Sequence, residues 1–344
     1  METEKLKVLT YRWHCAHQYE LWKLGFQVEL WHKPGVTMNW DYASRPMPGN
    51  AKLVTPEQAA ATRYDLVILH FDENILVPHK ARGALGLNWG AAFKELRRRP
   101  EPKVAICHGT PLTVGSFDIR HSGPVVVDER DRQDLVDLLG AIPVVCNSHA
   151  AMRQWGFRNG FVIWHGIDPN EFPYQAPKRP EVLITCSDMH ARPWYQGYFF
   201  AREVARGLPV RLIGRDPERK FAPVTLPAGP DRFSQYVKAI GEYLIFMNPT
   251  LLSPMPRSRI EAAMTGACIV TTNHHDEDMW IKQGVNGYYT NDASEMREMI
   301  TDLLEHPDKA MQIGRTGSND FASLFHVNRY LDDWKELLHK EVFN

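Results

Sequence analysis

Short runs of hydrophobic residues alternate along the chain with stretches of helical periodicity. The apolar runs are rich in Val, Ile and Leu and predict buried strands at residues 6–11, 27–32, 64–71, 103–108, 143–147 and 161–164. Helical spacing between them predicts helices at residues 17–24, 84–98, 128–139 and 148–155. Ser148 is placed to cap the last of these helices. Strands that alternate with helices predict a parallel, doubly wound sheet.

The pattern is interrupted by two stretches without hydrophobic periodicity. Residues 33–62 are rich in Pro, Gly and small polar residues and predict a long loop. Residues 168–180 (DPNEFPYQAPKRP) contain four prolines and predict a linker between domains. Beyond it the alternation resumes, with strands expected at residues 181–186, 210–214, 243–247 and 268–272, and helices at 194–206, 231–240, 258–265, 294–305, 307–324 and 328–340.

The predicted fold class is therefore α/β, with two Rossmann-like doubly wound parallel-sheet domains that face each other across a cleft. The boundaries we expect are 1–167 for the N-terminal domain, 168–180 for the linker, 181–325 for the C-terminal domain and 326–344 for a last helix. A length of 344 residues suits two domains. Ligands of open α/β sheets bind beyond the carboxyl ends of the strands, which places the expected site in that cleft.

Charge and apolar content narrow the possible functions. Lys and Arg total 40 and Asp and Glu total 41, a balance that argues against a strongly basic nucleic-acid-binding protein. One local basic cluster stands out, formed by Lys94, Arg97, Arg98, Arg99 and Lys103. No hydrophobic run approaches the roughly 18 residues that a membrane-spanning helix needs. The charged first residues do not resemble a signal peptide, and the five widely spaced cysteines suit free thiols, so we expect a cytoplasmic protein.

The segment at residues 248–270 (NPTLLSPMPRSRIEAAMTGACIV) is the most informative about a binding site. A loop with three prolines joins a strand to a helix that is expected to end at Gly266. The amino end of such a helix offers N–H groups and partial positive charge to a phosphate. Glu261, about one turn into the helix, could accept hydrogen bonds from two sugar hydroxyls. The alternative is an ordinary solvated glutamate.

This segment resembles the signature of retaining glycosyltransferases of the two-Rossmann-domain (GT-B) type, in glycosyltransferase group one. That signature reads roughly P-S-x-x-E-x-x-x-x-x-x-x-E-A-M-A-x-G-x-P-V-V. Pro249 and Thr250 take the Pro-Ser places, residues 261–266 (EAAMTG) resemble E-A-M-A-x-G, and residues 268–270 fall on P-V-V. Further similar segments occur in the family's order at residues 144–149, 162–172, 283–289 and 311–317.

The resemblance implies roles for individual residues. The second glutamate of the signature grips the ribose of the nucleotide sugar, a role that falls to Glu261, and the backbone around residues 250–256 would line the diphosphate. The first glutamate, close to the donor sugar in the family, falls on Ser253. The family's phosphate-binding lysine is replaced by Gln196, so Arg192 or Arg257 would balance the diphosphate charge, with Arg259 as a further candidate. Each arginine could instead be a solvated surface charge.

Two further positions belong to the N-terminal domain, which binds the acceptor in the family. His108-Gly109 resembles the family's "H-G", whose histidine contacts the transferring sugar; the alternative is a hydrogen-bonded histidine at a strand end. His14 and His17 replace the family's Gly-rich loop. They could bind an acceptor hydroxyl or a phosphate, or only fill that corner of the fold. In GT-B proteins the last helix packs back on the first domain, so the resemblance implies the same for residues 326–344; the alternative is a helix that covers the second domain.

A metal site is not expected. Residues 276–278 (DED) form a D-x-D pattern, which binds a divalent cation in the other major class of glycosyltransferase. Here the pattern lies late in the chain, just before a helix whose dipole favours acidic residues. His274 and His275 lie beside it without a third ligand at convincing spacing. We therefore expect no cofactor and no metal, with a nucleoside-diphosphate sugar as the donor substrate.

The sequence thus predicts an enzyme: a glycosyltransferase that moves a sugar from a nucleoside-diphosphate sugar to an acceptor hydroxyl, retaining by resemblance and metal-independent. The acceptor is a glycan, a lipid-linked molecule, a small molecule or modified DNA. The first alternative is a phage-type enzyme of the same fold that glycosylates DNA bases, which would need a basic band across the site. The second is a non-catalytic nucleotide-sugar-binding protein, suggested by Ser253 and Gln196 at positions where the family has a glutamate and a lysine.

Overall fold

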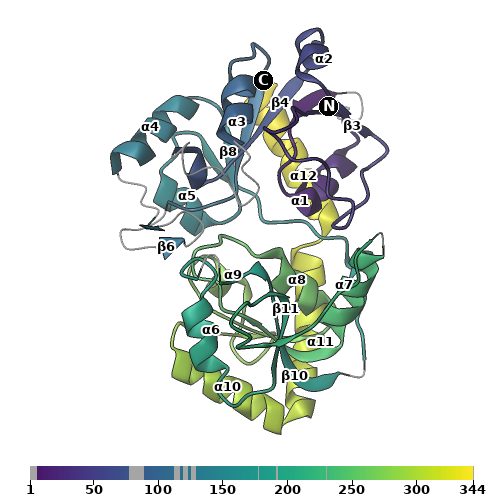
Figure 1. Cartoon of the computed structure of the whole chain (residues 1–344), viewed down its shortest axis with the longest axis vertical. Coiled ribbons are helices and arrows are strands. Elements are labelled where there is room, and N and C mark those ends of the chain that lie inside the picture. The colour runs from purple at the N-terminus through teal and green to yellow at the C-terminus, as the bar shows by residue number, and fades with distance from the viewer. Residues whose placement is uncertain are drawn as a thin grey trace. The chain divides into compact units, whose positions relative to one another are not determined.

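The computed structural model describes residues 6–76, 89–111, 117–118, 123–124, 129–176, 178–190, 193–229 and 231–343. The chain divides into two compact units (Figure 1). The N-terminal unit comprises Met1–Val114, Val126–Gly166 and Asn328–Asn344, and the C-terminal unit comprises Gly115–Val125 and Ile167–Val327. Each unit is built around one parallel sheet with helices packed on it, as the alternating sequence pattern predicts.

The N-terminal unit holds a seven-stranded parallel sheet in the order β3-β2-β1-β4-β5-β8-β9. Its strands are β1 (Lys7–Thr10), β2 (Gln27–Trp31), β3 (Ala51–Val54), β4 (Leu66–Phe71), β5 (Lys103–Cys107), β8 (Val144–Cys146) and β9 (Gly160–Val162). Its helices are α1 (Cys15–Leu21), α2 (Pro56–Ala60), α3 (Trp89–Arg97), α4 (Glu129–Leu139), α5 (His149–Trp155) and α12 (Val327–Leu337). The strand order reverses between β1 and β4, so the topological switch point lies at their carboxyl ends.

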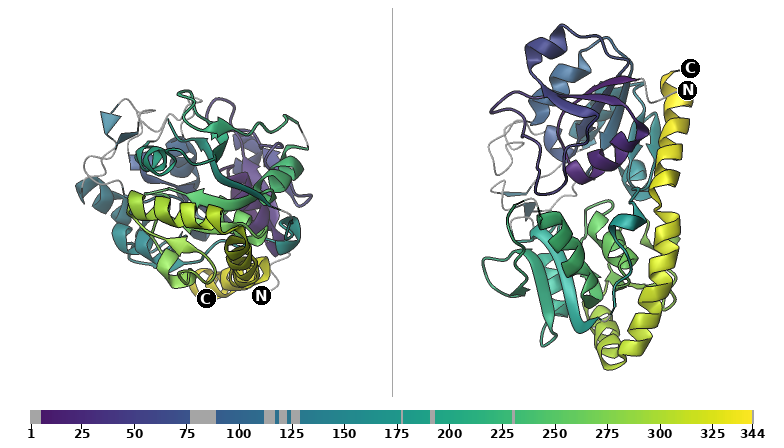
Figure 2. Two further views of the ribbon diagram at one scale, coloured as in Figure 1. Left: turned by 90° about the horizontal axis from the view of Figure 1, so that it is seen from below. Right: turned by 90° about the vertical axis from the view of Figure 1, so that its right-hand side faces the viewer.

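Alternating side chains of these strands point to opposite faces of the sheet and build two cores. Leu9, Val67 and Ala105 belong to one buried cluster, together with side chains from α3, α4 and α5. Their neighbours Val8, Leu66 and Val104 belong to a second cluster, which α1 and α12 cover. Helix α12 supplies the side chains of Tyr330, Trp334 and Leu337 to that cluster. Figure 2 shows this last helix running beside the sheet of the N-terminal unit.

The C-terminal unit holds a six-stranded parallel sheet in the order β12-β11-β10-β13-β14-β15. Its strands are β10 (Arg179–Asp188), β11 (Val210–Arg215), β12 (Ala222–Pro223), β13 (Tyr243–Asn248), β14 (Cys268–Thr271) and β15 (Tyr288–Tyr289). Its helices are α6 (Tyr198–Val204), α7 (Arg232–Gly241), α8 (Arg257–Met264), α9 (Glu277–Trp280), α10 (Ala293–Glu305) and α11 (Pro307–Leu324). Strands β6 (Phe117–Asp118) and β7 (Gly123–Pro124) form a separate antiparallel pair. The switch point of this sheet lies between β10 and β13.

The prediction of two Rossmann-like parallel-sheet domains is confirmed, and one local prediction is wrong. Residues 33–62 are not one long loop, because β3 pairs in parallel with β2 and α2 follows it. Strand β3 is a short edge strand in which Val54 alone is buried, so it lacks a strong apolar run. Thr55 and Gln58 form a reciprocal capping box at the start of α2, and this sequence signal identifies the helix.

The proline-rich stretch at residues 168–180 follows the surface of the C-terminal unit. It contains a short 3₁₀ helix (Pro169–Glu171), and its last residues open β10. The Gln175 backbone N–H donates to the carbonyl of Thr265. Lys178 Nζ donates to the carbonyls of Gly241 and Thr265, at the carboxyl ends of α7 and α8. Burial lowers the pKa of this lysine to about 8.

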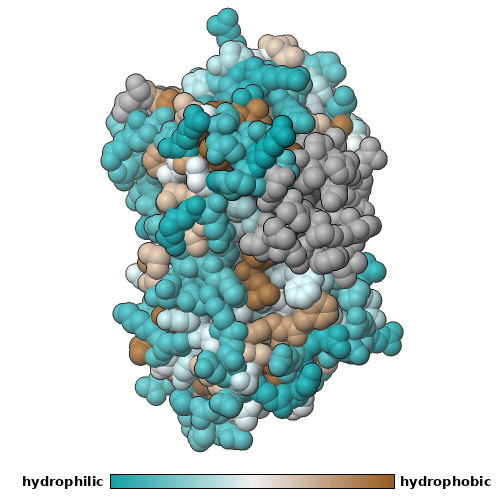
Figure 3. Space-filling model, turned by 90° about the vertical axis from the view of Figure 1, so that its left-hand side faces the viewer, coloured by the Kyte–Doolittle hydropathy of each residue, from teal (hydrophilic) through white to brown (hydrophobic). Residues whose placement is uncertain are grey.

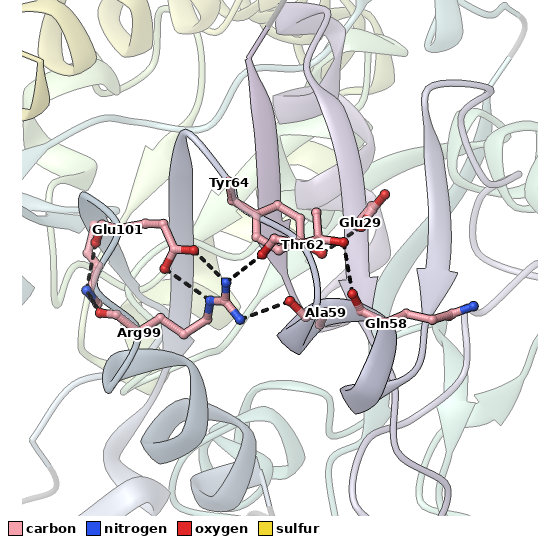
Figure 4. A network of polar contacts seen from close by, with 8 residues as sticks. Glu29, Gln58, Ala59, Thr62, Tyr64, Arg99 and Glu101 are labelled. Atoms are coloured by element: carbon pink, nitrogen blue, oxygen red, sulfur yellow. Dashed lines mark hydrogen bonds and ion pairs between the residues drawn. The ribbon is translucent and has the colours of Figure 1, made fainter.

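A buried polar network joins strands of the N-terminal sheet near their amino ends (Figure 4). The Tyr64 hydroxyl donates to Glu29 Oε2 at 2.6 Å, and Lys7 and Lys52 pair with the same carboxylate. Arg99 lies 5.2 Å from the centre of the Tyr64 ring and donates to the carbonyls of Ala59 and Thr62. The basic residues predicted as a cluster around Lys94–Lys103 thus include Arg99, which is committed to this network at the amino end of β5.

Replacing Tyr64 by phenylalanine should lower the free energy of unfolding by about 1.5–3 kcal/mol, the usual range for a hydrogen bond to a charged group. The bond is short and its acceptor is the buried Glu29 carboxylate. Urea denaturation measures the loss. The matched control is Tyr42→Phe, because Tyr42 is 61% exposed and its variant should stay within about 0.5 kcal/mol of the parent. Equal stabilities of the two variants would show that the hydrogen bond from Tyr64 to Glu29 adds nothing to the free energy of unfolding.

Two predictions about the chain as a whole can be compared with the described residues. All five cysteines are free, and four of them are buried, as expected. In the part of the chain that the structure describes, no helix combines the length and the apolar character needed to cross a membrane. On the face that Figure 3 shows, hydrophobic side chains outside the grey region form small groups among hydrophilic ones.

Candidate functional site

The first candidate site lies at the switch point of the C-terminal sheet, where the loops after β10 and β13 leave its carboxyl edge. The two loops touch: a Cβ on Gly197 would lie 1.9 Å from the carbonyl oxygen of Pro249. Gly197 also has φ +69°, a left-handed conformation that favours glycine. The backbone N–H groups of Leu251 and Leu252 both donate to the carbonyl of Tyr195, which fixes the second loop on the first. This loop leads directly into α8.

Glu261 projects from α8 into a polar setting and is 5% exposed. Its Oε2 accepts a hydrogen bond from the Tyr236 hydroxyl on α7 at 2.8 Å. Its Oε1 lies 3.3 Å from Nε of Arg257, one helical turn earlier. The alternative of a solvated glutamate is therefore wrong, since the carboxylate is buried and held from two sides. A carboxylate fixed in this way keeps lone pairs for further donors, such as the two hydroxyls of a ribose.

The Arg259 guanidinium is buried against another residue of the chain and does not face a ligand site. Its side chain, 2% exposed, forms an ion pair with Glu277, which is 3% exposed. The guanidinium also lies 4.8 Å from the centre of the Trp280 ring. Burial acts to raise the pKa of Glu277, but the charge of Arg259 and the His275 N–H outweigh it and lower that pKa. The predicted role of Arg259 as a phosphate-balancing cation and the solvated alternative both fail, because this residue ties α8 to α9.

Two other predicted residues of this unit, Thr250 and Ser253, lie in the same loop. Thr250 is buried, and its carbonyl accepts a hydrogen bond from the Thr272 hydroxyl at 2.6 Å. Ser253 is half-buried in the loop between β13 and α8. Arg192 lies outside the described residues. The structure thus brings Thr250, Ser253 and Arg257 into one segment that ends at Glu261.

Gly197→Ala should lower both stability and ligand affinity at this site. A methyl group there meets backbone atoms of Pro249 at 1.9 and 2.8 Å, so the loop before α8 has to move. We expect a loss of about 2–4 kcal/mol, which combines overpacking with the cost of a left-handed alanine. Gly35→Ala is the matched control, because Gly35 has φ +76° but open space around it. Thermal unfolding separates the two variants, and equal losses would rule out the loop contact as the cause.

The second candidate site is a group of aromatic side chains at the switch point of the N-terminal sheet. His108 follows β5, and its N–H donates to the carbonyl of Phe71 at the end of β4. His108 Nε2 lies 2.9 Å from Nδ1 of His70, inside β4. The His108 ring stacks on Trp13, with centroids 5.5 Å apart, and the rings of His14 and His17 each lie 5.4 Å away. The structure therefore brings together His17 and His108, which the sequence placed 91 positions apart.

Burial keeps the inner histidines uncharged. It lowers the pKa of His70 to about 3, with the charge of His14 as a smaller cause. Burial also lowers the pKa of His108 well below its usual value, and the charges of His70, His14 and His165 act in the same direction. Both rings are neutral at physiological pH. Each therefore has one nitrogen that donates and one that accepts.

Gly109 lies close to the end of the Glu73 side chain at this edge of the sheet. A Cβ on Gly109 would lie 2.0 Å from Oε2 of Glu73, and its carbonyl accepts a hydrogen bond from Trp155 Nε1 at 3.0 Å. A cavity of about 10 Å³ is lined by His17, Gln18, His70, His108 and Asn147, among others. That volume is at the lower limit for a single water molecule. A substrate therefore has to reach His108 from outside this cavity.

The two sites differ in what they can bind. The described residues contain no group of three or more His, Cys, Asp or Glu side chains that could hold a metal ion, and this holds for residues 274–278 as well as for the histidines. Glu277 of the D-x-D pattern instead accepts the backbone N–H groups of His274 and His275. The C-terminal site offers a helix amino end, an arginine and a carboxylate, which suits a phosphorylated ribose. The N-terminal site offers neutral imidazoles and an indole, which suit hydroxyl groups.

The sequence did not reveal several residues of these sites. Tyr236 reaches Glu261 from a different helix, and only the predicted position of α7 beside α8 could have suggested it. His70 is a polar residue in the otherwise apolar run of β4, a signal that marks it for a specific role. Gln18 and Trp13 flank the predicted histidines of the first loop without any motif.

The chain is similar to known proteins in part of its sequence and in its fold. Residues 197–336 match the family model described as "Glycosyl transferase-like". Among solved structures, HepE of Anabaena in complex with UDP and glucose has a TM-score of 0.68 at 14% identity, covering 97% of this chain and 100% of that chain. Sucrose-phosphate synthase from Thermosynechococcus elongatus has a TM-score of 0.71 at 13% identity, covering 98% and 99%. A glycosyltransferase from Rickettsia africae has a TM-score of 0.64 at 13% identity, covering 97% of both chains.

A search of curated proteins finds no match to this chain. At these identities the solved structures establish the fold, and they establish it over nearly the whole chain. The predicted GT-B fold is confirmed. Residues 197–336, which include most of the C-terminal unit, match that glycosyl transferase-like model, in agreement with the predicted resemblance to glycosyltransferases and with an enzyme of that class.

Proposed function

Starting from the GT-B fold and the glycosyl transferase-like match of the C-terminal unit, we propose that this protein transfers a sugar from a nucleoside-diphosphate sugar to an acceptor hydroxyl. The observation that carries the proposal is the buried carboxylate of Glu261, held by Tyr236 and Arg257 at the switch point of the C-terminal sheet. A nucleotide is the ligand class that combines a diol for this carboxylate with a phosphate for the nearby helix end.

The donor binds in the C-terminal unit through these groups. Glu261 accepts the ribose hydroxyls, and the loop at residues 250–256 lines the diphosphate. The amino end of α8 stabilises the negative charge that develops on the departing diphosphate, together with Arg257 or Arg192. This arrangement supplies positive charge from the chain itself, so the proposal includes a metal-independent reaction. Uracil is the first base to test, because HepE is described in complex with UDP and with UDP-glucose.

The acceptor belongs to the N-terminal unit and binds near His17, whose ring lies 5.4 Å from that of His108, the histidine proposed to contact the transferring sugar. In the proposed reaction the bond between the sugar's anomeric carbon and the diphosphate oxygen breaks, and a bond from that carbon to the acceptor oxygen forms. The acceptor proton passes to an oxygen of the leaving diphosphate. Attack from the face that the diphosphate leaves retains the anomeric configuration. No side chain is assigned as a covalent nucleophile.

The two alternatives from the sequence predict different binding behaviour. A DNA-base glycosyltransferase would bind duplex DNA with a strong dependence on salt. A non-catalytic protein would bind a nucleotide sugar and release no nucleoside diphosphate.

A thermal-shift screen tests the proposal. The protein is heated with UDP, GDP, ADP, CMP and the corresponding nucleotide sugars, because a ligand of the folded state raises the melting temperature. We expect one base to give a shift that Glu261→Ala abolishes. Release of the nucleoside diphosphate from the matching nucleotide sugar, with retained configuration in the product, then tests the reaction. No shift with any nucleotide would contradict the proposal.

A further inference from the structure

The orientation of one buried glutamine is fixed without ambiguity. Gln18 Oε1 lies 2.8 Å from the backbone nitrogen of Trp13, and Gln18 Nε2 lies 2.9 Å from the carbonyl oxygen of Tyr11. A backbone N–H can only donate and a carbonyl oxygen can only accept. The side-chain amide therefore cannot be exchanged end for end. Its second N–H points to Nε2 of His70, at 3.2 Å.

This orientation determines where the proton of His70 lies. Because Gln18 donates to Nε2 of His70, that nitrogen carries a lone pair. A neutral imidazole with a lone pair on Nε2 has its proton on Nδ1. That Nδ1–H faces Nε2 of His108 at 2.9 Å and donates to it. The backbone of His70 is held as well, since its N–H donates to the Tyr11 hydroxyl at 2.9 Å.

The same reasoning then applies to His108. Its Nε2 accepts from His70, so its proton lies on Nδ1. This Nδ1 is buried and has no hydrogen-bond partner among the described residues. A buried N–H without an acceptor is unusual in a folded protein, and such a group calls for an explanation. The natural explanation at a switch point is a ligand oxygen that completes the bond.

We propose that Gln18 and His70 are positioning residues that hold His108 as a hydrogen-bond donor through Nδ1, directed at a hydroxyl oxygen of the transferring sugar. The hydrogen bonds that link Trp13, Gln18, His70 and His108 thus determine which ring nitrogens donate and which accept. His108 binds the substrate and does not act as the general base, because its other nitrogen is occupied. The identity of the ligand rests on the proposed function, whereas the position of the proton does not.

The proton positions can be read directly by NMR of the whole protein labelled with ¹⁵N-histidine. Long-range ¹H–¹⁵N correlations distinguish protonated from unprotonated ring nitrogens, and His70→Asn and His108→Asn assign the two rings. At neutral pH and without substrate we expect protonated Nδ1 and unprotonated Nε2 in both. A proton on Nε2 of His108 would overturn the proposal, whatever the protein transfers.

Gln18→Glu tests whether Gln18 sets the tautomers of His70 and His108 through this series of hydrogen bonds, which we call the relay. A carboxylate accepts from Nε2 of His70 instead of donating to it, so the tautomers of His70 and then of His108 should both reverse. Gln154→Glu is the matched control, because Gln154 is exposed on α5 and makes the same change of charge. It should leave both tautomers as in the parent. Unchanged tautomers in a folded Gln18→Glu protein would refute the relay, and the parent spectrum remains decisive if that variant does not fold.

The role toward the sugar is tested once the nucleotide screen has identified a donor. His108→Asn keeps an N–H close to the position of Nδ1, whereas His108→Leu keeps only bulk. We expect the asparagine variant to retain at least tenfold more kcat/KM than the leucine variant. Equal activities of the two variants would exclude the donor role, while leaving the measured tautomers to stand or fall separately.

Discussion

Glu261→Gln should weaken the binding of the nucleoside diphosphate by about tenfold to a hundredfold. The substitution keeps the size of the side chain but removes the charge that ribose hydroxyls would contact. A hydrogen bond to a charged group contributes about 1.5–3 kcal/mol, and about 1.4 kcal/mol corresponds to a factor of ten in Kd. The carboxylate is buried beside Tyr236 and Arg257, so water cannot easily replace it.

Isothermal titration of the parent and the variant measures this loss. Glu298→Gln is the matched control, because Glu298 lies exposed on α10 and undergoes the same change. Its affinity should equal that of the parent. If Glu261→Gln folds and binds the nucleotide as tightly as the parent, Glu261 does not hold the ribose.

Arg259→Met should lower the free energy of unfolding of the C-terminal unit by about 3–5 kcal/mol, the range for breaking a buried ion pair by removing one partner. Glu277 would then stay buried without its cationic partner, and hydrogen bonds such as those from the N–H groups of His274 and His275 would compensate its charge only in part. The variant also loses the stacking of the guanidinium on Trp280. Because Arg259 lies on α8, this loss should loosen the helix that carries Glu261.

Urea denaturation measures the effect, and two further variants interpret it. Arg158→Met is the matched control, because the ion pair of Arg158 with Asp137 is exposed and should contribute at most about 1 kcal/mol. Adding Glu277→Gln to Arg259→Met should recover part of the lost stability, since no uncompensated charge remains. A double variant that is no more stable than Arg259→Met would show that packing, rather than charge, causes the loss.

Much of the fold follows from local patterns in the sequence. The buried strands β4 and β13 are continuous apolar runs, and a capping Ser148 marks the start of α5. These features depend on neighbouring residues alone, so a sequence reading can recover them. Strand β3 depends instead on pairing with β2, and it has no apolar run of its own. The local sequence pattern therefore predicts a loop at these residues.

The candidate sites were predicted less completely, because their residues meet only in the folded chain. A helical position for Glu261 follows from the sequence, but its burial depends on Tyr236, which lies 25 residues earlier. Arg259 looked like a surface charge because Glu277, its partner, lies beyond the next strand. The proton on His108 depends on Gln18 and His70, which are 52 residues apart in the chain. No local motif encodes such a relay.

The most direct test of the central claim is hydrogen–deuterium exchange of the whole protein with and without UDP, GDP and ADP in turn. Bound nucleotide should slow the exchange of amides that contact it or that its binding stabilises. With at least one nucleotide, we predict slower exchange in peptides that cover residues 249–261, from the loop after β13 into α8. Unchanged exchange in this segment with every nucleotide, or protection confined to other parts of the chain, would contradict the account.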